Sequence, residues 1–101
     1  MKNTRKTYQL KVPDEIAGLL RNLHPIIKSP IKISLQKIIH DPYCGKALKD
    51  ELPGLRSYRV KRYRIIYRIV AGENYLEIIA LGPRRNIYEE TFKIISKEGE
   101  G

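Results

Sequence analysis

A run of basic residues in the second half of the chain has the clearest potential for chemistry. Residues 52–72 contain no Asp or Glu, but they contain Arg56, Arg59, Lys61, Arg62, Arg64 and Arg68. Guanidinium groups stay charged at any working pH and bind phosphate oxygens bidentately. A polar surface of mixed charge would cost the fold less through self-repulsion. The run therefore predicts a phosphate-binding surface.

Alternation within this run predicts a β-hairpin. With Lys61 and Arg62 as a two-residue loop, Val60 pairs with Tyr63 and Arg59 with Arg64. Because opposed residues share a face, the apolar face consists of Tyr58, Val60, Tyr63, Ile65, Tyr67 and Ile69, and the basic face of Arg59, Arg64 and Arg68 with Lys61 or Arg62 at its rim. Lys-Arg is an unusual turn pair, so a slightly longer loop is an open alternative. The like-charged pair suggests that an anion sits between the two arginines.

The rest of the chain predicts the elements that must position this hairpin. Residues 8–12 alternate like a strand, and two apolar stripes at helical spacing predict helices at 14–23 and, beginning at Ser29-Pro30, up to 39. Residues 43–56 indicate a loop, 71–74 a turn and 75–81 a strand, and Asn86 begins a last helix. We predict an α+β fold with a small antiparallel sheet of about four strands, an N-terminal helical hairpin on one face and a short C-terminal helix.

Size and composition exclude several classes of protein. The chain has 101 residues and a net charge of +9, which fits a single domain over residues 1–101 with an anionic partner. The longest apolar run, Ile78 to Leu81, is far too short to span a membrane. The single Cys44 allows neither an internal disulfide nor a multi-cysteine metal site. Because residues 1–10 also lack a signal-peptide core, we expect a cytoplasmic protein without membrane, metal or cofactor.

Two stretches resemble the signature of the RelE/ParE toxin superfamily. Residues 54–67 read Gly-Leu-Arg-Ser-Tyr-Arg-Val-Lys-Arg-Tyr-Arg-Ile-Ile-Tyr, and residues 81–88 read Leu-Gly-Pro-Arg-Arg-Asn-Ile-Tyr. The order of elements is similar to that of the family over nearly the whole chain. The resemblance implies the toxin of a toxin–antitoxin pair. The ending from Arg84 to Tyr88 favours the RelE branch, whose members cut mRNA in the ribosomal A site, over the ParE branch, whose members inhibit DNA gyrase.

Site residues follow from the resemblance together with the basic run. The implied catalytic residues are Lys61, Arg64, Arg84 and Tyr88, and the implied RNA- or phosphate-binding residues are Arg59, Arg62, Arg68 and Arg85. Two departures from the family pattern are visible. Pro83 stands where many members have histidine, and the spacing from Arg84 to Tyr88 is shorter than in some nucleases, so Arg85 is an alternative to Arg84.

Cleavage of RNA by its own 2′-hydroxyl needs a base, stabilisation of charge and an acid for the leaving group. His24 and His40 end different helices of the predicted hairpin, about 15 Å apart at 1.5 Å per residue, so we expect ordinary helix-end roles for both. Tyr88 is then the candidate base, because nearby cations favour the phenolate. Its alternative role is packing against Phe92. Arg84 or Lys61 is the candidate proton donor.

The predicted partners are an acidic cognate antitoxin, the ribosome and mRNA. The antitoxin would neutralise the basic face, with a helix laid on the sheet or along the helical hairpin. An endoribonuclease toxin is the leading interpretation. A ParE-like toxin that inhibits gyrase without catalysis and a non-toxic RNA- or protein-binding domain on the same scaffold are the alternatives.

Overall fold

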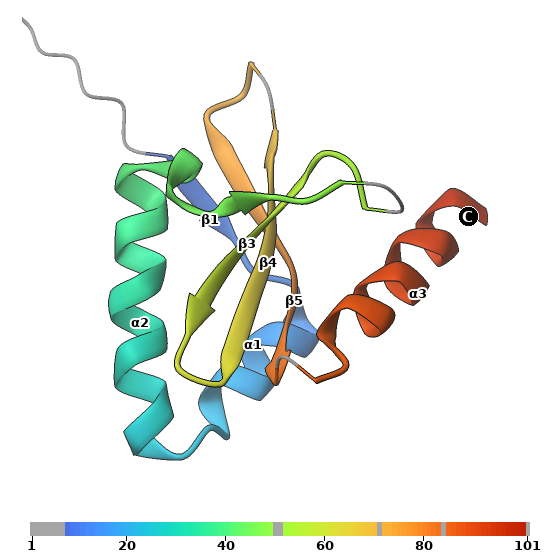
Figure 1. The fold of residues 1–101 in the computed structure, drawn as a ribbon. Coiled ribbons are helices and arrows are strands. Elements are labelled where there is room, and N and C mark those ends of the chain that lie inside the picture. The colour runs from blue at the N-terminus through green and yellow to red at the C-terminus, as the bar shows by residue number, and fades with distance from the viewer. Residues whose placement is uncertain (1–7, 50–51, 71, 84, 101) are drawn as a thin grey trace, which may run out of the picture.

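A computed structural model describes residues 8–49, 52–70, 72–83 and 85–100. The elements along the chain are β1 (Gln9–Lys11), α1 (Asp14–Arg21), α2 (Pro25–His40), the 3-10 turn η1 (Pro42–Cys44), β2 (Lys46–Ala47), β3 (Leu55–Val60), β4 (Tyr63–Val70), β5 (Tyr75–Pro83) and α3 (Ile87–Glu100). Figure 1 shows the sheet in the middle, with α2 on one side and α3 on the other. No helix of the described ranges is long and apolar enough to cross a membrane.

The sheet has five strands in the order β1-β5-β4-β3-β2. The α+β prediction is confirmed, and the sheet differs from the predicted one in two respects. Strand β1 pairs with β5 in parallel, because the helical hairpin returns the chain to the end of the sheet where β1 began. Strand β2 is an extra strand of two residues inside the predicted loop, too short to leave a periodic signal in the sequence.

The predicted register of the β3–β4 hairpin is confirmed. Val60 pairs with Tyr63 and Arg59 with Arg64, so Lys61 and Arg62 form the two-residue turn. Lys61 adopts a φ of 54°, in the left-handed region that a tight hairpin requires. Two arginines therefore lie directly opposite each other at the end of this hairpin.

Each face of the sheet carries a buried core of its own. Helices α1 and α2 cover the first core, in which Ile31, Ile38 and Tyr67 are fully buried. Helix α3 covers the second core, which contains Ile66 and Ile87. The sequence predicted a cover on one face only. Burial on both faces explains why β5 carries an unbroken apolar run instead of an alternating pattern.

The second helix begins earlier than the sequence predicted. Helix α2 starts at Pro25, and the His24 Nδ1 accepts a hydrogen bond of 3.2 Å from the backbone N–H of Ile26. The predicted start at Ser29-Pro30 is wrong, because Pro30 lies inside the helix. Both histidines consequently flank the same helix rather than ending two different ones. Its 16 residues separate them by about 24 Å, more than the sequence suggested.

Candidate functional site

The candidate site lies on the side of the β3–β4 hairpin that faces α3. Arg64 pairs with Arg59 on one neighbouring strand and with Gly82 on the other. A Cβ at Gly82 would lie 3.3 Å from the Cδ1 of Ile87, so the start of α3 packs closely over the end of β5. This close packing brings Tyr88, the second residue of α3, over the sheet next to Arg64.

Arg64 contacts two residues that are distant in sequence. Its guanidinium lies 5.9 Å from the centre of the Tyr88 ring, and its Nη1 donates a hydrogen bond of 3.4 Å to the Ser57 Oγ. Its Nε is buried and donates to no atom of residues 8–49, 52–70, 72–83 and 85–100. A buried donor without an acceptor destabilises a fold by about 1–3 kcal/mol. Such a donor calls for an explanation, and a site that receives an anion provides one.

Ser57 joins Arg64 to Tyr88 and was missed by the sequence reasoning. Its side chain is 2% exposed, and its Oγ lies 3.3 Å from the Tyr88 hydroxyl oxygen. A signal for it was present, because the alternation that places Arg59 on the basic face places Ser57 there as well. The structure thus places Arg64 beside both Arg59 and Tyr88, with a buried hydroxyl between Arg64 and Tyr88.

Three further predicted basic residues lie in the turns next to this centre. Lys61 and Arg62 are exposed in the hairpin turn, and the Arg59 Nε donates a hydrogen bond of 3.3 Å to the Lys61 carbonyl oxygen. Arg85 is exposed in the turn before α3. Arg84 lies outside the described residues. The site is therefore a cationic surface at the end of the hairpin, with the half-buried Tyr88 at its inner side.

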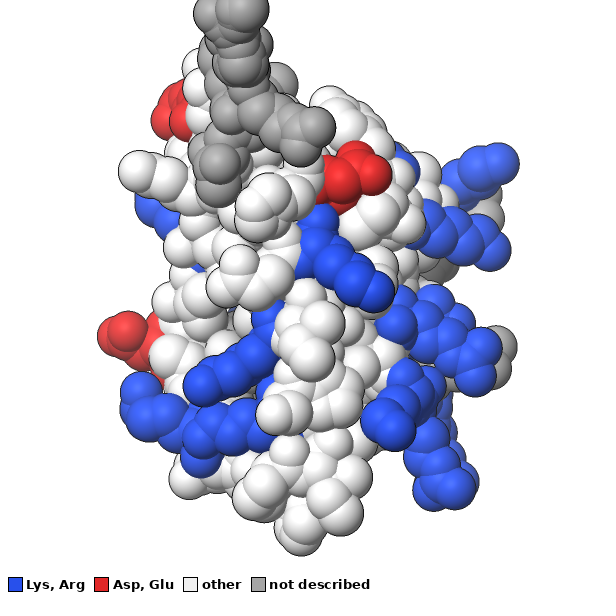
Figure 2. Space-filling view, turned by 90° about the vertical axis from the view of Figure 1, so that its left-hand side faces the viewer, with Lys and Arg blue, Asp and Glu red and all other residues white. Residues whose placement is uncertain are grey.

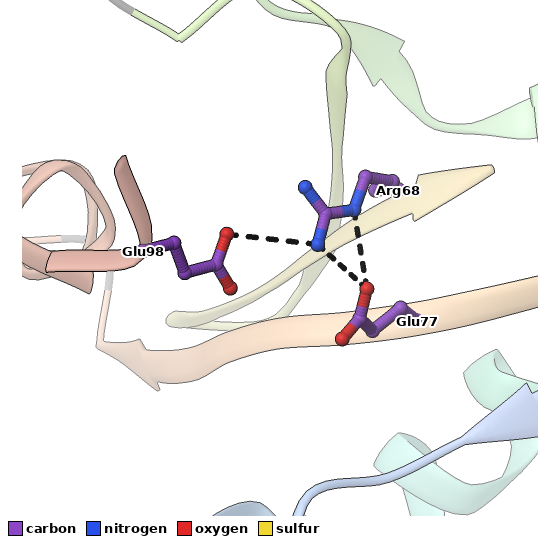
Figure 3. Close-up of polar contacts among 3 residues, drawn as sticks. All are labelled: Arg68, Glu77 and Glu98. Carbon is purple, nitrogen blue, oxygen red and sulfur yellow. Dashed lines mark hydrogen bonds and ion pairs between the residues drawn. The ribbon is translucent and has the colours of Figure 1, made fainter. Parts of the chain in front are cut away.

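Arg68 shares this face of β4, but its charge is paired with two carboxylates. Its Nη2 lies 2.7 Å from the Glu77 Oε1 and 3.7 Å from the Glu98 Oε1 (Figure 3). The hydrogen bond to Glu77 raises the pKa of Arg68. The predicted role of Arg68 in phosphate binding stays a prediction, but these carboxylates give it a structural one. It ties β4 to β5 and to the C-terminal half of α3.

A separate polar cluster on the opposite face of the sheet supports the loop before β3. The buried Tyr67 hydroxyl donates to the Pro42 carbonyl at 2.6 Å and accepts from the Gly45 N–H at 3.1 Å. The Arg56 Nη2 donates to the Gly45 carbonyl at 2.7 Å and to the Tyr43 carbonyl at 3.1 Å. Burial raises the pKa of Tyr67. Arg56 therefore belongs to the scaffold, although the sequence placed it in the basic run.

Positive charge also extends over the helical side of the molecule. Figure 2 looks onto the side on which α2 lies, where Lys and Arg side chains clearly outnumber Asp and Glu. Lys32 and Lys37 are exposed on α2. Within the ranges that the structure describes, no group of three or more His, Cys, Asp or Glu side chains could hold a metal ion. What the structure presents at the site is a set of guanidinium and hydroxyl groups suited to a phosphodiester.

Comparison with known proteins places the chain in a recognisable group. The family model described as "ParE-like toxin of type II bacterial toxin-antitoxin system" matches residues 10–92. No curated protein matches the chain.

Several solved structures share its fold. A chain of the toxin–antitoxin complex RelBE2 from Mycobacterium tuberculosis is 26% identical with a TM-score of 0.67, over 77% of this chain and 99% of that one. A mutant of the Escherichia coli toxin RelE in the free state is 17% identical with a TM-score of 0.74, over 91% and 97% of the two chains. The YoeB/ParE toxin from Agrobacterium tumefaciens is 18% identical with a TM-score of 0.65, over 75% and 98%.

Proposed function

The chain belongs to the ParE-like toxins of type II bacterial toxin–antitoxin systems, and we propose that it is an endoribonuclease that cleaves mRNA at the ribosome and inhibits translation. The observation that carries this proposal is the arrangement of Tyr88, Ser57 and Arg64 on a face that also presents Arg59. A toxin that only bound a protein target would not need a tyrosine hydroxyl held by a buried serine next to an incompletely paired arginine.

This arrangement supports transesterification by the ribose 2′-hydroxyl. Tyr88, as the phenolate, takes the proton of the 2′-hydroxyl, whose oxygen then attacks the adjacent phosphorus. The bond from phosphorus to the 5′ oxygen breaks, and the ammonium group of Lys61 gives its proton to that oxygen. The products are a 2′,3′-cyclic phosphate and a 5′-hydroxyl. Arg84 or the neighbouring Arg85 is the alternative proton donor.

Arginines stabilise the charge that develops in this reaction. The attacked phosphate carries two negative charges in the transition state, and preorganised cations lower its energy more than that of the ground state. Arg64 and Arg59 flank the proposed position of the phosphate, and Arg62 holds the RNA backbone at the rim. Near neutral pH, a tyrosine hydroxyl is a weak base, and ammonium and guanidinium groups are weak acids, so the rate depends on positioning of the RNA. This dependence favours an mRNA substrate that the ribosome arranges.

An acidic antitoxin is the proposed protein partner. Structures similar to this chain come from complexes that contain both a toxin and its antitoxin, including the RelBE complex of Escherichia coli and the RelE–RelB complex of Pyrococcus horikoshii. With a net charge of +9, this chain would attract an acidic partner and hold it by charge complementarity. Such a partner would cover the basic face and block access to Arg64.

Inhibition of DNA gyrase without catalysis is the second candidate function. The family model that matches the chain is named after ParE, and members of the ParE branch act on gyrase. A non-toxic RNA- or protein-binding domain is the third. The three candidates differ in what induction of the protein does to cells, so one experiment separates them.

The test is to induce the protein in bacterial cells and map the 5′ ends of mRNA by sequencing. We expect new ends phased with codons, which disappear in Arg64→Ala and Tyr88→Phe. Tyr75→Phe is the matched control, because Tyr75 lies at the far end of β5, where its ring contacts Lys11 at 4.5 Å. Loss of negative supercoiling with intact mRNA would instead establish the gyrase inhibitor. Unaffected growth would leave the binding domain.

A further inference from the structure

Ser57 differs from the other buried serine and threonine residues of the described chain. Ser34, Ser57 and Thr91 are the buried polar side chains there. The Ser34 hydroxyl donates to the Pro30 carbonyl at 2.8 Å, and the Thr91 hydroxyl donates to the Ile87 carbonyl at 2.7 Å. Both bonds are made to a residue four positions earlier in the same helix and need no further explanation.

The partners of Ser57 come from other elements of the fold. Its Oγ, on β3, contacts the Tyr88 hydroxyl on α3 and the Arg64 guanidinium on β4. Both partners are residues to which the proposed function gives a role in catalysis. A serine that merely filled space in the sheet would not need to contact either of them.

The donors and acceptors that each group carries indicate which atom donates in these hydrogen bonds. A guanidinium has donors only, so the bond from the Arg64 Nη1 uses a lone pair of the Ser57 oxygen. Among the described residues, the Tyr88 oxygen is the one atom near the Ser57 hydroxyl that could accept its hydrogen. Burial of Ser57 at 2% exposure makes an unmade bond costly. These capacities favour donation by Ser57 to the Tyr88 oxygen, which leaves the phenolic proton free to point away from the sheet.

We propose that Ser57 is a positioning residue. Its hydroxyl, polarised by the Arg64 guanidinium, holds the Tyr88 oxygen in the orientation needed to take the 2′-hydroxyl proton. This inference rests on the proposed ribonuclease function. A donated hydrogen bond stabilises a phenolate more than a phenol, and a donor that is itself bonded to a cation is stronger. Ser57 touches no substrate atom in this arrangement and acts through Tyr88.

The test uses purified protein and ribosomes programmed with a defined mRNA, with cleavage measured in a single turnover. Ser57→Ala should lower the maximal rate about tenfold, equivalent to about 1.4 kcal/mol, with an unchanged half-saturating ribosome concentration. Ser34→Ala is the matched control, since it removes another buried serine hydroxyl, one that contacts its own helix. In the Tyr88→Phe background, followed over a longer incubation, Ser57→Ala should cause less than about twofold further loss.

A second measurement does not depend on activity. In protein labelled with ¹³C at the Cζ of tyrosine, the resonance missing from Tyr88→Phe identifies Tyr88, and Ser57→Ala should shift it while Ser34→Ala does not. A Ser57→Ala protein that cleaves at the wild-type rate, or whose Tyr88 resonance is unchanged, overturns this inference alone. Wild-type protein that cleaves no RNA on ribosomes overturns the proposed function, and the inference with it.

Discussion

Alanine substitutions at Arg64 and Arg68 should affect different properties of the protein. Arg64→Ala should slow cleavage, and Arg68→Ala should lower stability. The two arginines lie on the same face of β4, four residues apart, but Arg68 is paired with two carboxylates and Arg64 with a serine and a tyrosine. A unit charge about 4 Å from a phosphate contributes about 4 kcal/mol at an effective dielectric constant near 20. We therefore expect Arg64→Ala to lower the single-turnover cleavage rate about 10³-fold.

Loss of Arg68 should reduce stability and leave the chemistry intact. The side chains of Arg68, Glu77 and Glu98 are 35%, 29% and 45% exposed, so solvent screens these ion pairs and their removal costs about 0.5–1 kcal/mol. For a domain of this size, that loss lowers the melting temperature by about 3–6 °C. Well below that temperature, the cleavage rate of Arg68→Ala should lie within about threefold of the wild-type rate.

Both variants are measured by cleavage of ribosome-bound mRNA and by thermal unfolding monitored with circular dichroism. Arg64→Lys serves as an intermediate case, because it keeps the charge but loses the planar fork that binds phosphate bidentately. Arg68→Ala should not slow cleavage as much as Arg64→Ala does at an unchanged melting temperature, and such a slowing would refute the separate roles given to the two arginines. That result would place Arg68 in the site, as the sequence alone suggested.

Three further predictions concern the scaffold. Gly45→Ala should lower the free energy of unfolding in urea by about 2–3 kcal/mol, because the new Cβ would lie 2.5 Å from the Tyr67 hydroxyl; an unchanged midpoint would contradict this. Burial raises the pKa of Tyr67 above its ordinary value of 10.0, so the unfolded state loses this proton at a lower pH than the folded state. The stability of the wild-type protein should therefore fall above about pH 10, and the stability of Tyr67→Phe should fall less steeply. His24→Ala should cost about 1 kcal/mol by removing a helix cap, and neither it nor His40→Ala should slow cleavage; a slower His40→Ala enzyme would revive a histidine mechanism.

The hairpin and its arginine pair were predictable because the signals are local. Alternation over Tyr58 to Ile69, broken at the turn and at Ile66, indicates which residues share a face, and a two-residue turn brings the apolar sets together. The ion pair of Arg68 was also within reach. Pairing outward from the predicted turn at 71–74 puts Arg68 opposite Glu77, which is the observed register.

Other features depend on contacts between distant parts of the chain. The position of α3 over the sheet comes from packing of Ile87 in the second core, and the single hint in the sequence was Ile66, an apolar residue between two arginines of the basic face. Two prolines, Pro25 and Pro30, are each typical of the first turn of a helix. Helix α2 begins at Pro25, and Pro30 lies inside it. The role of Ser57 became visible only when α3 brought Tyr88 to it.

The cost of the site within the fold argues for its use. Opposed like charges in a hairpin destabilise a sheet by up to about 1 kcal/mol, and the buried Arg64 Nε adds the cost of an unmade hydrogen bond. A glutamate at position 59 would remove the repulsion and keep the surface polar. An anion between Arg59 and Arg64 turns the same repulsion into attraction. The two cores on either side of the sheet tolerate this local cost, and under the proposed function the binding of a phosphodiester would offset it.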